Sequence, residues 1–158
     1  MATDQTTVTQ LPVSFYVLSD PKAQDILGFM VQLVQTALHK SKQSILVLSD
    51  ESSLLSELDE ALWSHDAVSF IPHQLLTTNT VDDLLAPVLL GDYLPEQFKG
   101  IVLNITARTV TDFIGATHNV SITRILEIIK PDTVSVGAGR AKYKHYQQLG
   151  HELTHFKV

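Results

Sequence analysis

An apolar run followed directly by a Ser-Asp pair and a helical stretch occurs twice in the first part of this sequence. Residues 13–18 form an apolar, β-rich run, and the Ser-Asp-Pro sequence at 19–21 combines an N-cap residue with a proline suited to the first helical turn. Apolar residues at helical spacing follow. The pattern repeats with a strand at 44–48, a Ser-Asp pair at 49–50 and a helix at about 51–63. Two successive strand–helix units predict an open, mostly parallel sheet.

The rest of the chain adds shorter elements of the same kinds. The expected segments are a short strand at 68–71 stopped by Pro72, a polar loop at 75–83, an apolar run at 88–90, a buried strand at 100–105, a strand at 122–129, a helix in the second half of 131–149 and an edge strand at 151–158. They predict a three-layer, nucleotide-binding-like α/β fold with helices on both faces of a mixed, mostly parallel sheet. A length of 158 residues suits one domain. We assign that domain to residues 11–158, after a flexible polar extension at 1–10.

The amino-acid composition excludes several classes of protein. The chain has no cysteine, which rules out a disulfide scaffold, a cysteine nucleophile, a thiolate zinc site and an iron–sulfur cluster. No apolar run approaches the ~18–20 residues of a membrane span. Residues 1–10 are polar and contain no lysine or arginine, unlike a signal peptide. The expected location is therefore the cytoplasm.

The charges are distributed unevenly along the chain. Residues 1–122 hold 14 acidic and 5 basic residues, a net charge of −9, whereas residues 123–158 hold 3 acidic and 6 basic residues, a net charge of +3. The overall charge of −6 argues against coating of nucleic acid, because that binding depends on Lys and Arg side chains neutralising phosphates. A basic corner on an acidic body favours a local anionic partner, and ordinary surface lysines are the alternative.

The sequence H-E-L-T-H at 151–155 matches the H-E-x-x-H motif of zinc peptidases. In those enzymes both histidines lie on one helical face and bind zinc, and the glutamate is the general base. Here the motif follows Gly150, which is typical of a helix end, and only three residues follow His155. In a strand, residues four positions apart are separated by about 13 Å, whereas zinc holds its nitrogen ligands at about 2.0–2.1 Å. We therefore expect no metal, with a zinc site at His151 and His155 as an alternative.

The sequence G-A-G-R-A-K at 137–142 is similar to the first half of a dinucleotide-binding fingerprint. It lacks the third glycine, and no strong strand runs directly into it. Neither a Walker A sequence nor a Gly-x-Ser-x-Gly elbow occurs in the chain. We expect no catalytic residue and no cofactor. The rival class is a small α/β enzyme or a nucleotide-binding protein that uses the histidine-rich C-terminal region.

The last predicted helix carries a possible binding face. Arg140, Tyr143, Lys144 and Gln147 follow one another at helical spacing and share one face. Two cations beside an aromatic ring can hold the carboxylates of an acidic peptide while an apolar side chain packs nearby. The alternative is an ordinary solvated helix face.

Three stretches of the sequence resemble the chi subunit family of bacterial DNA polymerase III. L-D-E-A-L-W at 58–63 is similar to the family's L-D-x-x-L-W, and F-I-P-H at 70–73 is similar to its F-(I/V)-P-H. R-A-K-Y-K-H-Y-Q-Q-L-G at 140–150 is similar to the family's closing R-x-x-Y-(K/R)-x-Y-x-x-x-G. Together with Phe15-Tyr16 and the order of elements, the similarity covers about residues 12–156.

This resemblance implies an accessory subunit of the clamp-loader complex, with no nucleotide and no chemistry of its own. The implied partners are the psi subunit and the acidic, phenylalanine-ended tail of single-stranded DNA-binding protein, so that DNA is contacted only indirectly. Arg140, Tyr143 and Lys144 would form the tail site. Phe70 and Trp63 would belong to the psi-facing surface, which related members also use for a helicase.

The chain departs from the family pattern at the edges of the implied tail pocket. Residues 134–139 have no charged side chain and include two glycines, so a flanking cation is expected to be missing. Residues 156–158 lack the tryptophan often found there. For Trp63 the alternative is a place in the core, because it ends an amphipathic helix. Phe70 and Ile71 alternate across a short strand, so only one of them should face the interior.

Overall fold

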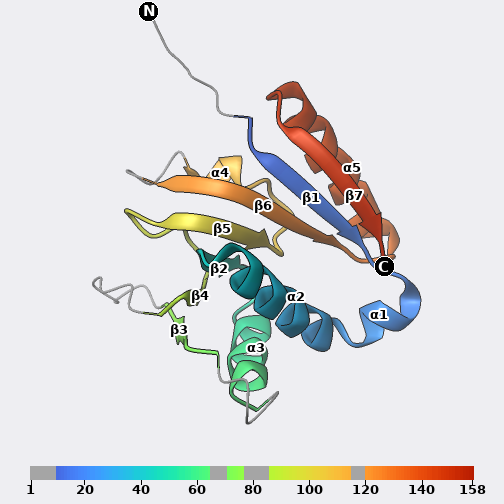
Figure 1. Ribbon diagram of the computed structural model, residues 1–158. Helices are drawn as coiled ribbons and strands as arrows, with labels where there is room; N and C mark the ends of the chain where they lie inside the picture. The colour runs from blue at the N-terminus through green and yellow to red at the C-terminus, as the bar shows by residue number, and fades with distance from the viewer. Residues whose placement is uncertain (1–9, 65–70, 77–85, 115–119) are drawn as a thin grey trace, which may run out of the picture.

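A seven-stranded sheet forms the centre of the computed structural model, which describes residues 10–64, 71–76, 86–114 and 120–158. The strand order is β3-β4-β2-β5-β6-β1-β7 (Figure 1). The strands are β1 (Pro12–Val17), β2 (Ser44–Leu48), β3 (His73–Leu75), β4 (Val88–Gly91), β5 (Lys99–Asn104), β6 (Ser121–Ile129) and β7 (Glu152–Lys157).

All strand pairings in the described residues are parallel. The prediction of an open, mostly parallel α/β sheet is confirmed, but the antiparallel pairs of a mixed sheet are absent from the described strands. The physical reason lies at the C-terminal end, where the chain crosses over through helix α5 (Thr133–Gln148) before it enters β7. A crossover of that length returns β7 in the same direction as β1, and β7 takes the sheet edge as expected.

Helices cover both faces of this sheet. They are α1 (Asp20–Gln24), α2 (Ile26–Ser41), α3 (Ser52–Ser64), α4 (Thr111–Ile114) and α5. One hydrophobic core packs α2 and α3 against the sheet, and a second packs α4 and α5 against it. Strand β2 serves both, because Ile45 and Val47 enter the first core while Leu46 and Leu48 enter the second. None of the described helices is both long and apolar enough to cross a membrane.

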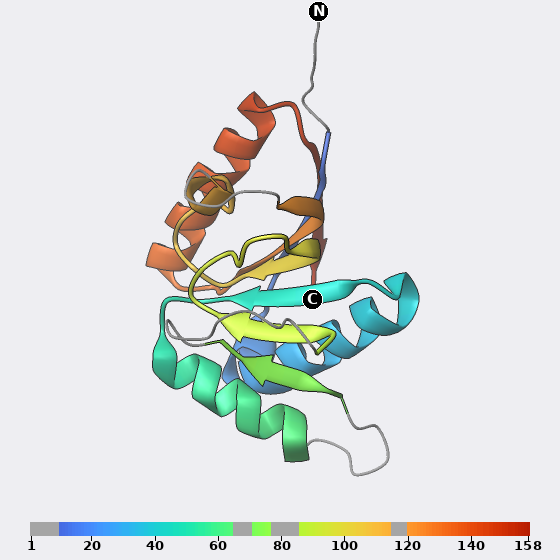
Figure 2. The ribbon, with the colours of Figure 1, turned by 90° about the vertical axis from the view of Figure 1, so that its left-hand side faces the viewer.

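The helices α3 and α5 lie at opposite ends of the sheet. Helix α5 packs on β6 and β7, and α3 packs on β3 and β4. Figures 1 and 2 show this separation from two directions, with α5 in red and α3 in green. Any surfaces carried by these two helices are therefore well separated.

The segment after β1 is two helices, although the sequence predicts one. Helix α1 begins after Ser19 with proline in its first turn, but it ends at Asp25, whose backbone leaves the helical region (φ −122°, ψ 56°). The carboxylate of Asp25 then accepts a hydrogen bond from the Gly28 N–H at 3.2 Å and caps α2. Aspartate favours such local bonds over a continuous helix.

Two other element boundaries differ from the prediction. Helix α5 spans its whole segment rather than the second half, because Asp132 accepts a hydrogen bond from the Ser135 N–H at 3.0 Å and caps the first turn. Strand β3 begins directly after Pro72, at residues where no strand was expected. A proline is compatible with this place because its missing N–H is not needed for pairing. Most of the strand expected at 68–71 lies outside the described residues.

Candidate functional site

Helix α5 presents two different faces. Lys142 and Tyr146 point into the protein and are buried, with Lys142 only 4% exposed. Arg140 and Lys144 are exposed, and Tyr143 is half-buried between the two faces. The predicted helical face is therefore present, and its two cations are available to a partner.

The buried face of α5 is held by a polar network that the sequence analysis did not predict. Lys142 Nζ donates to Glu127 Oε1 at 2.8 Å, and the Tyr146 hydroxyl donates to Glu127 Oε2 at 2.7 Å. Asn104 Nδ2 donates to the same Oε2 at 2.8 Å, and the Tyr146 hydroxyl accepts from the Val110 N–H at 2.9 Å. The signal in the sequence was Glu127 itself, a carboxylate within the apolar run of β6.

The ionisation of this network suits a structural role. Burial raises the pKa of Glu127, and the Lys142 cation with the hydrogen bonds from Lys142, Tyr146 and Asn104 opposes that rise. Burial and the Glu127 carboxylate raise the pKa of Tyr146, so its hydroxyl keeps its proton and donates it. Each of these groups is already bound within the chain, and the network orients α5 rather than offering a reactive group.

An apolar pocket of about 320 Å³ lies beside the exposed face of α5. Its aromatic floor is built from Phe15 of β1 and Tyr143, whose ring centroids are 5.4 Å apart. The lining residues are Phe15, Val17, Ile129, Val136, Gly139, Arg140, Tyr143 and His155. Arg140 and Tyr143 are thus brought together as predicted, whereas Lys144 is exposed on α5 and is not among the described lining residues.

The edges of this pocket come from within or beside the two segments that depart from the family pattern. Val136 supplies an apolar wall one turn before Arg140, within the segment where we expected a cation to be missing. His155 supplies the opposite wall from β7, and its ring meets Tyr143 edge-on at 6.1 Å. In the sequence, His155 stood out only as a possible zinc ligand of the H-E-x-x-H motif. Its place in the pocket follows from the parallel pairing of β7 with β1, which sets His155 beside Phe15.

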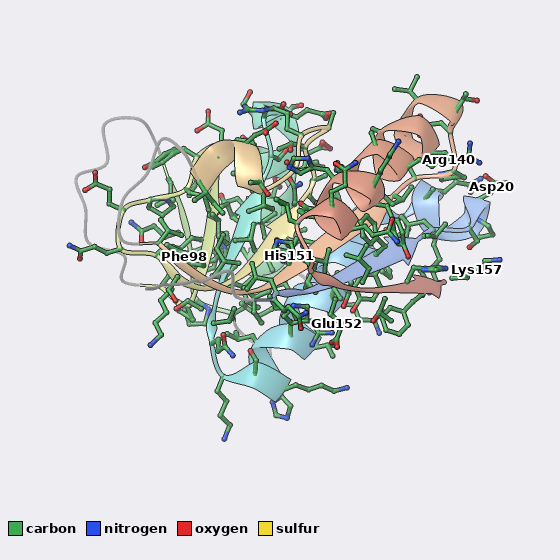
Figure 3. All side chains as sticks on the ribbon, turned by 90° about the horizontal axis from the view of Figure 1, so that it is seen from above. Asp20, Phe98, Arg140, His151, Glu152 and Lys157 are labelled. Atoms are coloured by element: carbon green, nitrogen blue, oxygen red, sulfur yellow. The ribbon has the colours of Figure 1, made fainter. Side chains whose placement is uncertain are left out.

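The H-E-x-x-H motif forms most of strand β7, as the sequence analysis predicted. His151 Nδ1 lies 3.3 Å from the Leu11 backbone nitrogen and accepts its hydrogen bond, near the start of β1. Figure 3 shows His151 and Glu152 at one end of β7 and Lys157 at the other end, on the side of the view where Arg140 also lies. In the described part of the chain no three His, Cys, Asp or Glu side chains gather as metal ligands would. His151 instead lies beside the start of β1, whereas His155 lines the pocket beside α5.

A second exposed surface lies at the far end of the sheet, around Trp63. Trp63 is 54% exposed, so the alternative of a core position is wrong. Its ring lies 4.6 Å from the ring of His73. Leu75 of β3 is also exposed, which extends the apolar surface beyond the helix. Phe70, which we expected beside Trp63, lies outside the described residues.

His73 and Asp59 connect β3 with α3 beneath Trp63. The His73 ring is buried, and its Nε2 is 2.9 Å from Asp59 Oδ1 while its Nδ1 is 2.8 Å from the Ile71 carbonyl oxygen. Asp59 of the 58–63 motif and His73 of the 70–73 motif thus contact one another, and the His73 ring packs against Trp63.

The crevice at the carboxyl ends of the strands carries both acidic and basic side chains. Folds of this type bind nucleotides there by backbone N–H groups and helix N-termini that face phosphate. Here the crevice, of about 260 Å³, is lined by the acidic side chains of Asp50 and Glu51, by Lys130 and by the first turn of α5. Lys142 also lines the crevice, but its ammonium group is paired with Glu127. The first strand is followed by Asp20 and Pro21, and the proline has no N–H to donate.

Comparisons with known proteins agree in pointing to one family. The family model described as "DNA polymerase III chi subunit, HolC" matches residues 12–154. The DNA polymerase III subunit chi of Pseudomonas aeruginosa is 32% identical over 149 residues, covering 92% of this chain and 96% of that protein. The DNA polymerase III subunit chi of Escherichia coli is 26% identical over 144 residues, covering 89% of this chain and 94% of that protein.

Among solved structures, a variant of Saccharomyces cerevisiae Dbp5, bound to Nup159, a Gle1 variant, IP6 and ADP, has a similar fold. The TM-score is 0.61 with 13% sequence identity, and the match covers 99% of this chain and 44% of that one. At this identity the likeness concerns the fold alone. It is a fold that also occurs in much larger proteins.

Proposed function

This chain belongs to the DNA polymerase III chi subunit family, and from that membership we propose that it is a noncatalytic adaptor of the clamp-loader complex. In this proposal residues 11–158 act as one domain, which joins the psi subunit to the acidic tail of single-stranded DNA-binding protein. DNA is then reached only through these partners, in keeping with the net charge of −6.

The pocket beside α5 carries the first part of the proposal. A peptide that ends in phenylalanine needs an apolar cavity for its last side chain and a cation for its terminal carboxylate. The pocket has apolar and aromatic walls, and Arg140 is at its edge. Arginine holds a carboxylate with two parallel hydrogen bonds. Lys144, exposed on the next part of the same helix, would attract the aspartates that precede the terminal residue.

The surface around Trp63 carries the second part. Exposed aromatic side chains are common anchors in protein–protein interfaces, and Trp63 and Leu75 are both exposed apolar residues on neighbouring elements. We assign this surface, together with Phe70, to the psi subunit or to a helicase that competes for it. The acidic residues that dominate the body of the protein keep the tail peptide away from this end.

Titration of a fluorescently labelled tail peptide tests the first assignment. Arg140→Ala should weaken binding by about 2 kcal/mol, or roughly 30-fold, because it removes the bidentate partner of the carboxylate. Lys144→Ala should cost nearer 1 kcal/mol, about fivefold, as befits a screened charge on a flexible side chain. Lys40→Ala, at the exposed end of α2, is the matched control and should bind like the parent.

Two further conditions sharpen this test. Binding should weaken when salt is raised to ~0.3 M, where the Debye length falls well below 10 Å. A tail peptide without its terminal phenylalanine should lose the contribution of the pocket. Equal affinity of Arg140→Ala and the parent would contradict the assignment of the tail site.

A further inference from the structure

The apolar pocket beside α5, which we call the tail pocket, is lined by a titratable side chain that the family motif does not include. His155 comes from β7, at the position paired with Phe15 of β1. It lines the pocket with Arg140 and Tyr143, and its ring meets the edge of Tyr143. Its side chain is exposed, so that a ligand in the pocket can reach it.

We propose that His155 binds the acidic tail directly and takes up a proton when the tail enters the pocket. This inference rests on the proposed function, because it concerns the same pocket and the same peptide. The step is simple in chemical terms: a proton moves from solvent to the imidazole, and the imidazolium pairs with a carboxylate of the peptide.

The charges around His155 explain why the peptide controls this proton. Arg140 and Tyr143 are the titratable groups on the facing helix, and Lys157 follows two positions later on the same side of β7. The lining residues from β1 and β6 are apolar, and no carboxylate is among the described residues that line the pocket. An arriving carboxylate therefore brings the first negative charge to this wall of the pocket, and it favours the charged imidazole.

This linkage predicts tighter binding at lower pH. Between pH 8 and pH 6 the carboxylates of the peptide stay ionised and Arg140 stays charged, because their ordinary titration ranges lie outside this interval. A histidine is the side chain whose charge changes within it. The parent should therefore bind the tail peptide about threefold more tightly at pH 6 than at pH 8, the size expected for an exposed ion pair.

Three variants of the full-length chain separate this proposal from a merely structural role of His155. His155→Phe keeps a ring in the wall but cannot take a proton, so its affinity should be independent of pH. His155→Lys is charged throughout, so its affinity should be high and equally flat. His39→Phe, at the exposed end of α2, is the matched control and should show the pH dependence of the parent.

Calorimetry in two buffers of different ionisation enthalpy measures the proton directly. The parent should take up a fraction of a proton at pH 7 when it binds the tail peptide, and His155→Phe should take up none. The same pH dependence in His155→Phe and the parent would overturn the proposal for His155, yet leave the tail site standing if Arg140→Ala still weakened binding. Failure of the parent to bind the peptide would overturn both.

Discussion

At the scale of single residues, Arg140 and Lys142 have opposite environments although they are two positions apart on α5. Arg140 is exposed beside the pocket, whereas Lys142 is buried against Glu127 and the Thr106 carbonyl oxygen. The helical repeat sends them to different faces. Lys142 thus holds α5 against the interior, whereas Arg140 stays at the surface, where the proposed tail site needs it.

Replacing the buried lysine should be costly. Lys142→Met leaves the Glu127 carboxylate buried without its cation, and we expect a loss of about 3–5 kcal/mol in the free energy of unfolding. Lys144→Met, two positions later and exposed, should change stability by less than about 0.5 kcal/mol. Urea denaturation of both variants provides the measurement, and equal midpoints would show that the Glu127 network contributes little.

His151 should make stability depend on pH. Burial, with a smaller effect of His145, lowers the pKa of His151 below its ordinary value of 6.5. The folded state therefore disfavours the protonated ring, so this contribution to stability is complete above pH 6.5 and is lost as the pH falls through the lower folded value.

The measurement compares the parent with His151→Asn, whose side-chain oxygen can still accept from the Leu11 N–H. Between pH 7.5 and pH 5 the parent should lose more stability than His151→Asn, by no more than about 0.5 kcal/mol, because the ring is only partly buried. An identical pH profile for the two proteins would remove His151 as the cause.

Sequence alone could predict the exposed residues of the tail site better than its walls. Arg140, Tyr143 and Lys144 share a helical face whatever the rest of the fold does. Phe15, Ile129 and His155 come from three different strands, and only the strand order β6-β1-β7 brings them together. That order is set by packing between distant segments, which local patterns do not encode.

At the scale of elements, the two glycines of α5 have different roles. A Cβ at Gly137 would meet nothing within 4 Å, whereas a Cβ at Gly139 would lie 2.8 Å from Ile129 Cδ1. Gly139 and Ile129 both line the pocket. The first glycine therefore costs helix stability without a packing reason, and the second lets α5 approach β6.

Alanine at the two positions should have opposite effects. Gly137→Ala should raise the free energy of unfolding by about 0.5–1 kcal/mol, because alanine favours the helix. Gly139→Ala should destabilise the protein by about 1–3 kcal/mol through crowding of Ile129, and it should also weaken binding of the tail peptide. Thermal unfolding and peptide titration measure both effects. A stabilised Gly139→Ala that binds normally would contradict this account of the helix–strand contact.

The type of each element was easier to predict than its ends. The strands at 13–18, 44–48 and 100–105 and the helix at 51–63 are present within a residue or two, because each is a long apolar pattern bounded by turn residues. The break at Asp25 and the early start of α5 depend on single side-chain hydrogen bonds to backbone N–H groups. Such bonds compete closely with a continuous helix, and pattern alone does not decide between them.

At the scale of the whole molecule, the two proposed interfaces are independent. The tail pocket is built on α5, β1 and β7, and the Trp63 surface is built on α3 and β3, at the other end of the sheet. They also face different cores. If the two assignments hold, we expect that both partners can be bound at the same time.

Variants that lose binding to one partner and keep binding to the other test this independence. Trp63→Ala should abolish capture of the psi subunit and cost less than about 2 kcal/mol of stability, since a buried tryptophan would cost about 3–5 kcal/mol. It should leave the affinity for the tail peptide unchanged, and Arg140→Ala should show the reverse pattern. Saturating tail peptide should change the affinity for psi by less than about twofold. Pull-down and titration with both partners give these values, and mutual exclusion would contradict the two-surface arrangement.

The position of β1 between β6 and β7 has a consequence for how the protein is made. The first strand to leave the ribosome pairs only with residues 121–129 and 152–157, which are translated near the end. Until then β1 is an apolar strand without a neighbour, and such long-range pairing is the slow part of folding. The tail pocket needs β1, α5 and β7 together, whereas Trp63, Asp59 and His73 emerge much earlier. A nascent chain thus completes the surface around Trp63 first, and only synthesis through the last strand completes the pocket beside α5.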